Sequence, residues 1–301
     1  LHSVIEPPKG WAPLELGELW KFSELLFFLT WRDIKVRYRQ TALGAAWAIL
    51  QPVLTMGLFS IIFGLLAKLP SEGVPYPIFT FTALLPWQLF AFALTQSSNS
   101  LIGSQNLISK VYFPRLVIPL SSVMAGLLDF AISLAVLVIM MLIYGIALTP
   151  AILLLPVFTL LALTSALAVG LWLSAMNVKY RDIRYVVPFL TQFWMYATPI
   201  AYSSALIPAE WRWLYSLNPM TGVVEGFRWA VLGQSALDPA SLLISAAVVI
   251  ALLVGGLEPS DFTQANEVRE GLEAASFVIS LEQRLSEVTE RADVVFPIAL
   301  I

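Results

Sequence analysis

Long runs of apolar residues, separated by short polar segments, dominate the first 257 positions of the chain. No charged residue stands between Arg39 and Lys68. About 20 consecutive apolar residues suffice for a helix to cross the hydrocarbon core of a bilayer. The pattern predicts six membrane-spanning helices, at about residues 44–67, 78–97, 116–144, 151–175, 186–203 and 239–257.

An amphipathic segment precedes the first run. Over residues 14–39 apolar side chains recur at roughly helical spacing, and basic and aromatic side chains such as Arg37 and Trp31 gather towards its end. This composition suits a helix lying at an anionic membrane surface. A soluble helix packed on a core is the alternative. We favour the interfacial helix because a predicted span follows within a few residues.

The segment at residues 204–238 is too apolar and aromatic for an ordinary loop. We expect re-entrant helices that enter the membrane from outside, before the last span, where protein covers their backbone. A pair of helices lying on the surface is the alternative. The aromatic and polar side chains of this segment suit either stacking on sugar rings or an outer aromatic belt. The candidates are Trp211, Asn218, Glu225 and Arg228.

Composition and charge support this picture of an all-α polytopic membrane protein. The chain is 58% hydrophobic and 12% charged, whereas a soluble domain carries about 25% charged residues. Lipid must therefore cover much of the surface. With the N-terminus inside, most Lys and Arg residues fall in cytoplasmic segments, as the positive-inside rule requires. The outer segments hold only Lys68, Arg212 and Arg228.

The sequence contains no recognisable catalytic or metal-binding constellation. It has no cysteine and a single histidine, His2, which argues against thiol catalysis, a Ser-His-Asp triad and a histidine metal cluster. An integral-membrane enzyme is therefore disfavoured. No glycine-rich phosphate loop ending in Gly-Lys is present. Any ATP used for transport must bind another polypeptide.

Asp129 is the one acid deep in a predicted span. A carboxylate at such a position is costly and is a functional-site hypothesis by default. Asp129 could pair with a basic group, carry a coupling proton or face a polar pathway. It could also be a buried acid satisfied by Ser and Thr hydroxyls.

The predicted cytoplasmic loop at residues 109–119 places an apolar trio between two positive charges, followed by a helix-stopping proline. An exposed aromatic knob ringed by charge is typical of docking surfaces. A juxtamembrane anchor with its aromatics in the interface is the alternative. The residues concerned are Lys110, Val111, Tyr112, Phe113, Pro114 and Arg115.

Four long stretches carry a family resemblance, at residues 31–52, 84–121, 178–202 and 217–233. Together they resemble the ABC-2-type permeases of exporters that move O-antigen, capsule or teichoic acid chains. The resemblance implies a non-enzymatic multi-pass subunit of the cytoplasmic membrane, with its N-terminus inside. It also implies a homodimer with two ATP-binding cassette subunits, which bind ATP and Mg, and a lipid-linked glycan as substrate. No cofactor is expected in this chain, and no nucleic acid as partner.

The resemblance assigns roles to specific residues. The loop from Lys110 to Arg115 is similar to the coupling helix that docks on the ATPase. Leu43 and Gly44 resemble the turn at the channel entrance, a candidate gate. The cytoplasmic mouth would contain Arg181, Asp182 and Arg184, near lipid or polymer phosphates, unless these residues simply enforce topology.

Two other functions remain open at this stage. An ion-gradient-driven carrier would use Asp129, and it would work without any ATPase. An ABC-2 exporter of a small lipid or drug would share the predicted architecture.

The last part of the chain departs from the family pattern. The sequence divides into an N-terminal tail and interface helix (1–40), a six-helix domain (41–257) and an acidic segment (258–301). A helix from Asn266 to about Glu290 and an unstructured tail are both compatible with the acidic segment. Residues 285–299 resemble part of the large iron–sulfur subunit of respiratory NADH dehydrogenase. Because the segment has no cysteine and no cofactor-binding loop, we assign it no activity.

Overall fold

The computed structural model describes residues 20–39, 46–108, 110, 113–180, 182–233 and 238–256. Within these ranges every regular element is a helix and there is no strand, which confirms the all-α prediction. Among the described residues, five helical segments are long and apolar enough to cross a membrane. They are Ala46–Leu66, Tyr76–Gly103, Val117–Tyr144, Pro150–Lys179 and Pro239–Gly256.

Several of these segments are built from two consecutive helices. α3 continues into the π-helix η1, α6 is followed after one residue by α7, and the 3-10 helix η2 leads into α8. The described helices are α2 (Ser23–Arg39), α3 (Ala46–Phe59), η1 (Ser60–Leu66), α4 (Tyr76–Gly103), α5 (Gln105–Ile108), α6 (Val117–Met124), α7 (Gly126–Tyr144), η2 (Pro150–Leu154), α8 (Leu155–Lys179), α9 (Ile183–Ala197), η3 (Ser204–Leu206), η4 (Ala209–Trp211), α10 (Arg212–Ser216), α11 (Pro219–Leu232) and α12 (Pro239–Gly256).

Prolines and glycines set the ends of several helices. A proline stands in the first turn of α4, α8 and α11, where its missing N–H costs no helical hydrogen bond. α7 and α11 end at Gly145 and Gly233, whose φ angles are +68° and +66°. Only glycine adopts this left-handed cap without strain.

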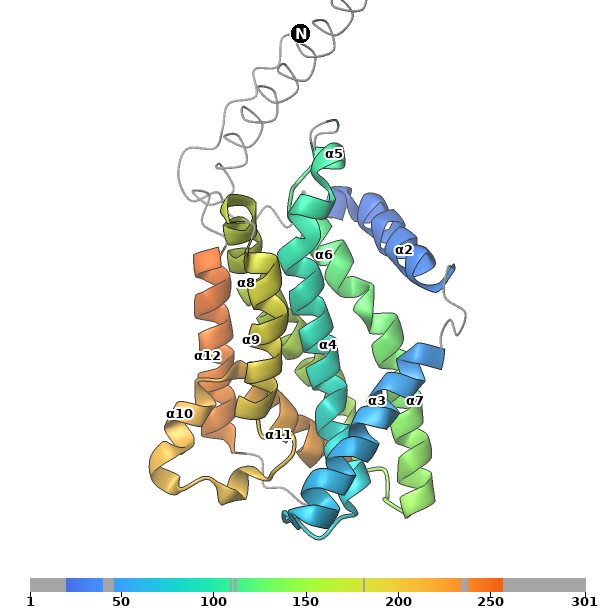
Figure 1. The fold of residues 1–301 in the computed structure, drawn as a ribbon, viewed down its shortest axis with the longest axis vertical. Helices are drawn as coiled ribbons and strands as arrows, with labels where there is room; N and C mark the ends of the chain where they lie inside the picture. The colour runs from blue at the N-terminus through green and yellow to red at the C-terminus, as the bar shows by residue number, and fades with distance from the viewer. Residues whose placement is uncertain are drawn as a thin grey trace, which may run out of the picture. The chain divides into compact units, whose positions relative to one another are not determined.

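The long helix α4 is the centre of the domain (Figure 1). It packs most extensively on α8 and also contacts α3, α6, α7, α9 and α11. Its side chains are therefore buried around most of its circumference, as Ile78, Phe79 and Phe90 show. A helix with apolar side chains on most of its faces suits this enclosed position.

The fifth predicted span coincides with a shorter helix. α9 has 15 residues, which at 1.5 Å per residue cover about 22 Å, against a hydrocarbon core of about 30 Å. A buried turn follows it, and Thr198, Ile200 and Ser203 are enclosed there. α9 is therefore not among the five long segments, and the count of six spans stays a prediction.

α2 lies beside α6 at the same end of the domain as α5, whereas α10 lies at the opposite end (Figure 1). Four buried side chains hold α2 in place, and we call them the α2–α6 cluster: Leu29, Phe113, Val117 and Ile118. The other face of α2 exposes large apolar groups, among them Phe27, Phe28 and Val36. Such a helix has the composition expected at a membrane surface.

The described part of the segment between α9 and α12 contains four helices, η3, η4, α10 and α11, and their entry into the membrane stays a prediction. η3, η4 and α10 are short, and α11 packs between α4, α8 and α12. Most side chains of α11 are buried. The acidic segment from residue 258 onwards lies outside the described residues, as do residues 1–19.

Candidate functional site

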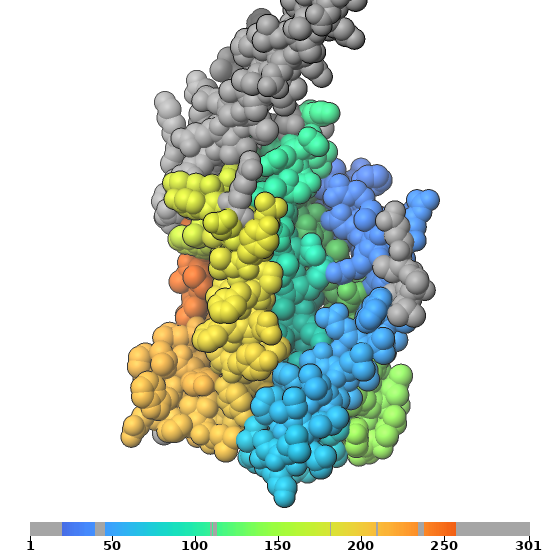
Figure 2. Space-filling model, in the orientation of Figure 1, coloured from blue at the N-terminus to red at the C-terminus, as the bar shows by residue number. Residues whose placement is uncertain are grey.

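A cavity of about 540 Å³ opens between α3, α4, α7 and α9. Figure 2 shows the surface of α4 set back between the surfaces of α9 and α3 in this part of the molecule. The lining of the cavity combines amide, hydroxyl and aromatic side chains with apolar ones. The polar members are Arg37, Gln51, Thr55, Gln88, Thr95, Gln96, Asp129, Ser133, Thr191 and Gln192; the aromatic members are Trp47, Trp87, Phe92 and Phe130.

Helical spacing explains why these polar groups meet in one place. Residues four apart lie on the same face of a helix. Gln88, Phe92 and Gln96 follow this spacing on α4, as do Asp129 and Ser133 on α7. This spacing brings Gln88 and Gln96 of α4, and Asp129 and Ser133 of α7, to the face of each helix that lines the cavity.

Hydroxyl groups in the cavity donate to backbone carbonyl oxygens of the same helix or of a neighbouring one. Thr55 donates to the carbonyl oxygen of Gln51 at 2.9 Å, and Thr95 donates to that of Ala91 at 2.8 Å. Ser133 donates to the carbonyl oxygen of Ala48 at 3.2 Å, which joins α7 to α3. The glutamine amides of the lining offer both donors and acceptors, so the wall suits a hydroxyl-rich ligand.

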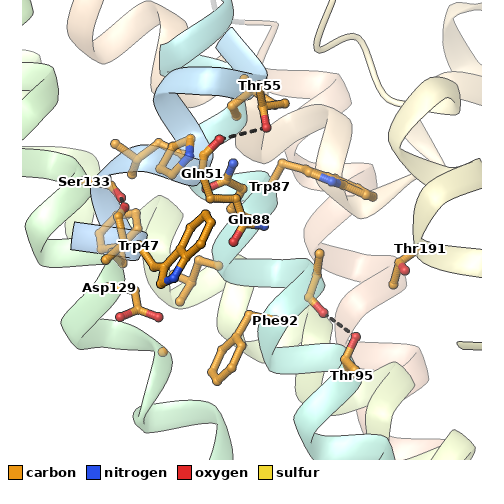
Figure 3. A pocket seen from close by; sticks show the side chains of 18 of the residues that line it. Trp47, Gln51, Thr55, Trp87, Gln88, Phe92, Thr95, Asp129, Ser133 and Thr191 are labelled. Atoms are coloured by element: carbon orange, nitrogen blue, oxygen red, sulfur yellow. Dashed lines mark hydrogen bonds between the residues drawn. The ribbon is translucent and has the colours of Figure 1, made fainter. Parts of the chain in front are cut away.

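Aromatic rings complete the wall. In Figure 3, Trp47 and Phe92 lie between Asp129 of α7 on one side and Thr191 of α9 on the other. Flat apolar rings beside hydrogen-bonding groups match the two kinds of surface on a sugar. The site can therefore contact a glycan by stacking and by hydrogen bonds together.

Asp129 is ion-paired. Its Oδ2 atom accepts a hydrogen bond from Nη1 of Arg37 at 2.6 Å, and its Oδ1 atom accepts one from the Tyr38 hydroxyl. Pairing with a basic group was one of the alternatives for this acid. The pair joins the end of α2 to the start of α7, at the edge of the cavity.

The sequence indicated only part of this site. The sequence offers Gln, Asn, Ser, Tyr and Trp side chains near residues 96–106 and 192–202, and of these Gln96 and Gln192 line the cavity. The serines that follow Gln96 have a different role: Ser97, Ser98 and Ser100 are buried. The carbonyl oxygen of Ser98 accepts a hydrogen bond from Asn177 of α8, and these small residues allow α4 and α8 to pack closely.

The other lining residues were missed, although a signal for them exists. Gln51 and Gln88 each stand alone in an apolar run, so no polar stretch of the sequence marks them. The four-residue spacing of Gln51 with Thr55, and of Gln88 with Gln96 through Phe92, would have grouped them. Which of the stripes face each other depends on how the helices pack.

The loop at residues 110–115 is only partly as expected. Lys110 is exposed, and Pro114 and Arg115 are half-buried. Burial lowers the pKa of the Arg115 guanidinium below its usual value. Phe113 is not an exposed knob: it is 6% exposed within the α2–α6 cluster, because α2 covers it. Val111 and Tyr112 lie outside the described residues.

Of the predicted gate and mouth, only Asp182 and Arg184 lie in the described part of the chain. Leu43 and Gly44 of the proposed gate, and Arg181 of the proposed mouth, lie outside the described residues. Asp182 precedes the first turn of α9 and is exposed, and the Arg184 guanidinium lies 5.4 Å from the ring of Tyr185. Both stand at the N-terminus of α9.

The predicted outer residues differ from one another in exposure. Trp211 is exposed and Glu225 is half-buried. Asn218 and Arg228 bond to the protein itself: Asn218 caps α11 and bonds Trp194 and Thr198, and Arg228 is completely enclosed. The structure does not bring the four together as one open site.

Comparison with known proteins places the chain in a family. The family model for ABC-2 type transporters matches residues 24–232. The O-antigen export system permease protein RfbA of Myxococcus xanthus is 32% identical over 239 residues, covering 78% of this chain and 91% of that protein. The polysialic acid transport protein KpsM of Escherichia coli is 28% identical over 233 residues, covering 75% and 88%.

A further match has a different character. A subunit of the NADH-quinone oxidoreductase of Mycobacterium bovis is 55% identical over 64 residues, which are 21% of this chain and 8% of that protein. Because the match covers so little of either protein, it gives no ground for assigning the activity of that subunit to this chain. The ABC-2 family model, by contrast, matches more than two thirds of the chain and includes every element that lines the cavity. The chain is therefore a member of the ABC-2 type transporter family.

Proposed function

We propose that this chain is the membrane subunit of an exporter that moves a lipid-linked polysaccharide outward across the cytoplasmic membrane. The observation that carries the proposal is the cavity, whose amides, hydroxyls and rings stand among apolar helices. A hydroxyl-rich chain cannot cross hydrocarbon unless its polar groups find partners. The names of the similar proteins support polysaccharide as the cargo.

The arrangement in the membrane follows from the same proposal. α9 and the turn after it form the sixth, short crossing, and α2 lies at the cytoplasmic surface. α10 and α11 enter the membrane from outside. Two copies of the chain form the pathway, so the open side of the cavity between α3 and α9 faces it.

Energy comes from two separate ATP-binding cassette subunits, which hold ATP and Mg. They dock on the loop from Lys110 to Arg115 and on α2. Because Phe113 packs under α2, a push on the loop moves α2 as well. Leu43 and Gly44 form the entrance gate, and Arg181, Asp182 and Arg184 form the cytoplasmic mouth.

An ion-gradient-driven carrier has less support. A proton carrier needs a carboxyl group that is available for protonation, whereas Asp129 is held by Arg37 and Tyr38. A transporter of a small lipid or drug would not need so many amide and hydroxyl groups along its wall.

The test is transport by the chain copurified with the ATPase encoded beside it and reconstituted in vesicles. The probe is a fluorescent oligosaccharide linked to undecaprenyl diphosphate. We expect ATP-dependent movement, reduced several-fold by Gln88→Leu and by Thr55→Val. Both residues line the cavity.

Thr164→Val is the matched control. Thr164 also donates to a carbonyl oxygen four residues earlier in its helix, as Thr55 does, but it does not line the cavity. Failure to copurify with the ATPase, or equal transport by the Thr55 and Thr164 variants, would contradict the proposal. Transport without ATPase that is lost in Asp129→Asn would support the carrier instead.

A further inference from the structure

Arg37 is the cationic side chain in the described lining of the cavity. It stands in the last turn of α2, and its guanidinium is held between two groups. Asp129 binds Nη1 at 2.6 Å on one side, and the ring of Phe92 lies 3.9 Å from the guanidinium carbon on the other. The side chain is 34% exposed and that of Asp129 is 31% exposed, so a ligand can reach both.

The position of Arg37 in the chain sets its depth. The first long apolar segment begins at Ala46, a few residues after α2 ends at Arg39. Its partner Asp129 stands in the first turn of α7, so we take the pair to lie towards the lipid headgroups rather than at the centre of the hydrocarbon. A lipid-linked substrate carries its phosphate at this same level, because its hydrocarbon tail stays in the bilayer.

The chemistry of the pair suits exchange of anions. A guanidinium presents a planar fork of donors that fits carboxylate and phosphate oxygens. In the ion pair, Asp129 occupies this fork through a single nitrogen, Nη1. A diphosphate has more charge and more acceptor oxygens than a carboxylate, so it can replace Asp129 on the fork while Phe92 continues to support the cation.

From this geometry we infer that Arg37 binds the diphosphate group of the substrate and that Asp129 occupies the site when substrate is absent. The inference rests on the proposed function, because it takes the cavity to be the entry to the transport path. It assigns the lipid-proximal end of the substrate to Arg37 and the sugars to the amides and rings beyond it.

A purely structural ion pair makes the opposite prediction for one variant. If the pair only fastens α2 to α7, loss of either partner weakens the protein and any ligand site alike. If Asp129 competes with the ligand, Asp129→Asn leaves Arg37 unneutralised and strengthens anion binding. The sign of the Asp129→Asn effect therefore separates the two.

The experiment measures binding by calorimetry to the purified full-length chain in detergent. The probes are farnesyl diphosphate, inorganic pyrophosphate, glucuronate and the neutral alcohol farnesol. We expect binding of farnesyl diphosphate that Arg37→Gln weakens at least about tenfold and Asp129→Asn strengthens about tenfold, because each changes one partner of a charge-assisted contact. Arg37→Lys keeps the positive charge but lacks the planar pair of donors, so its affinity for farnesyl diphosphate should lie between those of the unmodified chain and Arg37→Gln.

Arg32 and Asp33 provide the matched control. They form an ion pair of 2.8 Å on the same helix, but neither lines the cavity. Arg32→Gln should leave the affinity for farnesyl diphosphate unchanged. Thermal unfolding and gel filtration identify any variant that is not folded, and Arg37→Lys then replaces Arg37→Gln in the comparison.

Each pattern of results has a definite reading. If farnesyl diphosphate and pyrophosphate both bind and farnesol does not, recognition of the phosphate group is supported. If only pyrophosphate binds, the site prefers a free anion over a lipid headgroup, and the inference is overturned. Tighter binding of glucuronate overturns it in favour of acidic sugars. Weaker binding in Asp129→Asn, or unchanged binding in Arg37→Gln, also overturns it.

This experiment needs no ATPase, so it is independent of the test of the proposed function. If the chain binds farnesyl diphosphate through Arg37 but does not assemble with an ATPase, the proposed binding site is supported and the proposed exporter function is contradicted. If ATP-driven transport occurs but Arg37→Gln binds farnesyl diphosphate as tightly as the unmodified chain, the exporter function is supported and the proposed role of Arg37 is contradicted.

Discussion

The guanidinium carbon of Arg228 lies 3.7 Å from the centroid of the Phe79 ring, which joins α11 to the central helix α4. Nη2 of the same group donates to the carbonyl oxygen of Ile200 at 2.7 Å, and Nη1 donates to that of Tyr202 at 3.2 Å. Arg228 thus connects α11, α4 and the turn after α9. Its contacts hold these three parts of the domain together.

Replacing Arg228 by Ala should destabilise the protein strongly. Two buried carbonyl oxygens lose their donors, at about 1–3 kcal/mol each, and the contact with Phe79 is lost. We expect a clearly lower unfolding temperature in detergent. Arg212→Ala is the control, because Arg212 is exposed; equal unfolding temperatures for the two variants would refute the structural role.

Asn218 should be needed for the junction of α9 with α11. Its Oδ1 accepts from the Met220 amide at 3.0 Å and from Nε1 of Trp194 at 2.8 Å, and its Nδ2 donates to Thr198. Asn218→Ala removes the cap, at about 1 kcal/mol, together with both side-chain bonds. Asn218→Asp keeps the acceptor and should be less harmful in thermal unfolding, an order that a surface-exposed Asn would not produce.

Phe113 and Lys110 belong to the same predicted docking loop but should behave differently. Phe113→Ala empties part of the α2–α6 cluster, and such a truncation costs about 3–5 kcal/mol in a packed core. We therefore expect Phe113→Ala to lower stability. It should also increase proteolysis of α2, measured on the full chain.

Lys110→Ala should leave stability unchanged, because Lys110 is exposed. If the loop docks on an ATPase, this variant should instead weaken copurification and stimulation of ATP hydrolysis. Normal stability of Phe113→Ala would contradict the packing, and normal coupling in Lys110→Ala would weigh against this lysine as a docking contact.

Gly126 should tolerate no side chain. A Cβ atom there would lie 2.5 Å from Cδ1 of Phe92, the ring that supports Arg37. Gly126→Ala should therefore displace Phe92 and lower the unfolding temperature. A Cβ atom at Gly57 would have nothing within 4 Å, so Gly57→Ala should be neutral or stabilising by up to about 1 kcal/mol. A smaller fall in unfolding temperature for Gly126→Ala than for Gly57→Ala would contradict the close contact.

Local sequence determined the helices, the apolar segments and the family. Runs of apolar residues bounded by Pro and Gly predict helices because each helix satisfies its own backbone hydrogen bonds, wherever its neighbours lie. Five predicted spans accordingly match the long helical segments. The fifth predicted run is the exception, because its C-terminal residues 198–203 form a buried turn rather than helix.

Tertiary structure alone decided which polar residues serve the cavity and which serve packing. Arg37 and Asp129 are 92 residues apart, and their pairing is set by α2 resting on α6. Ser97 and Gln96 are neighbours in sequence, yet one is buried and the other lines the cavity. On a helix adjacent residues point about 100° apart, so their roles depend on which helix packs against each face, and that is set by contacts between distant segments.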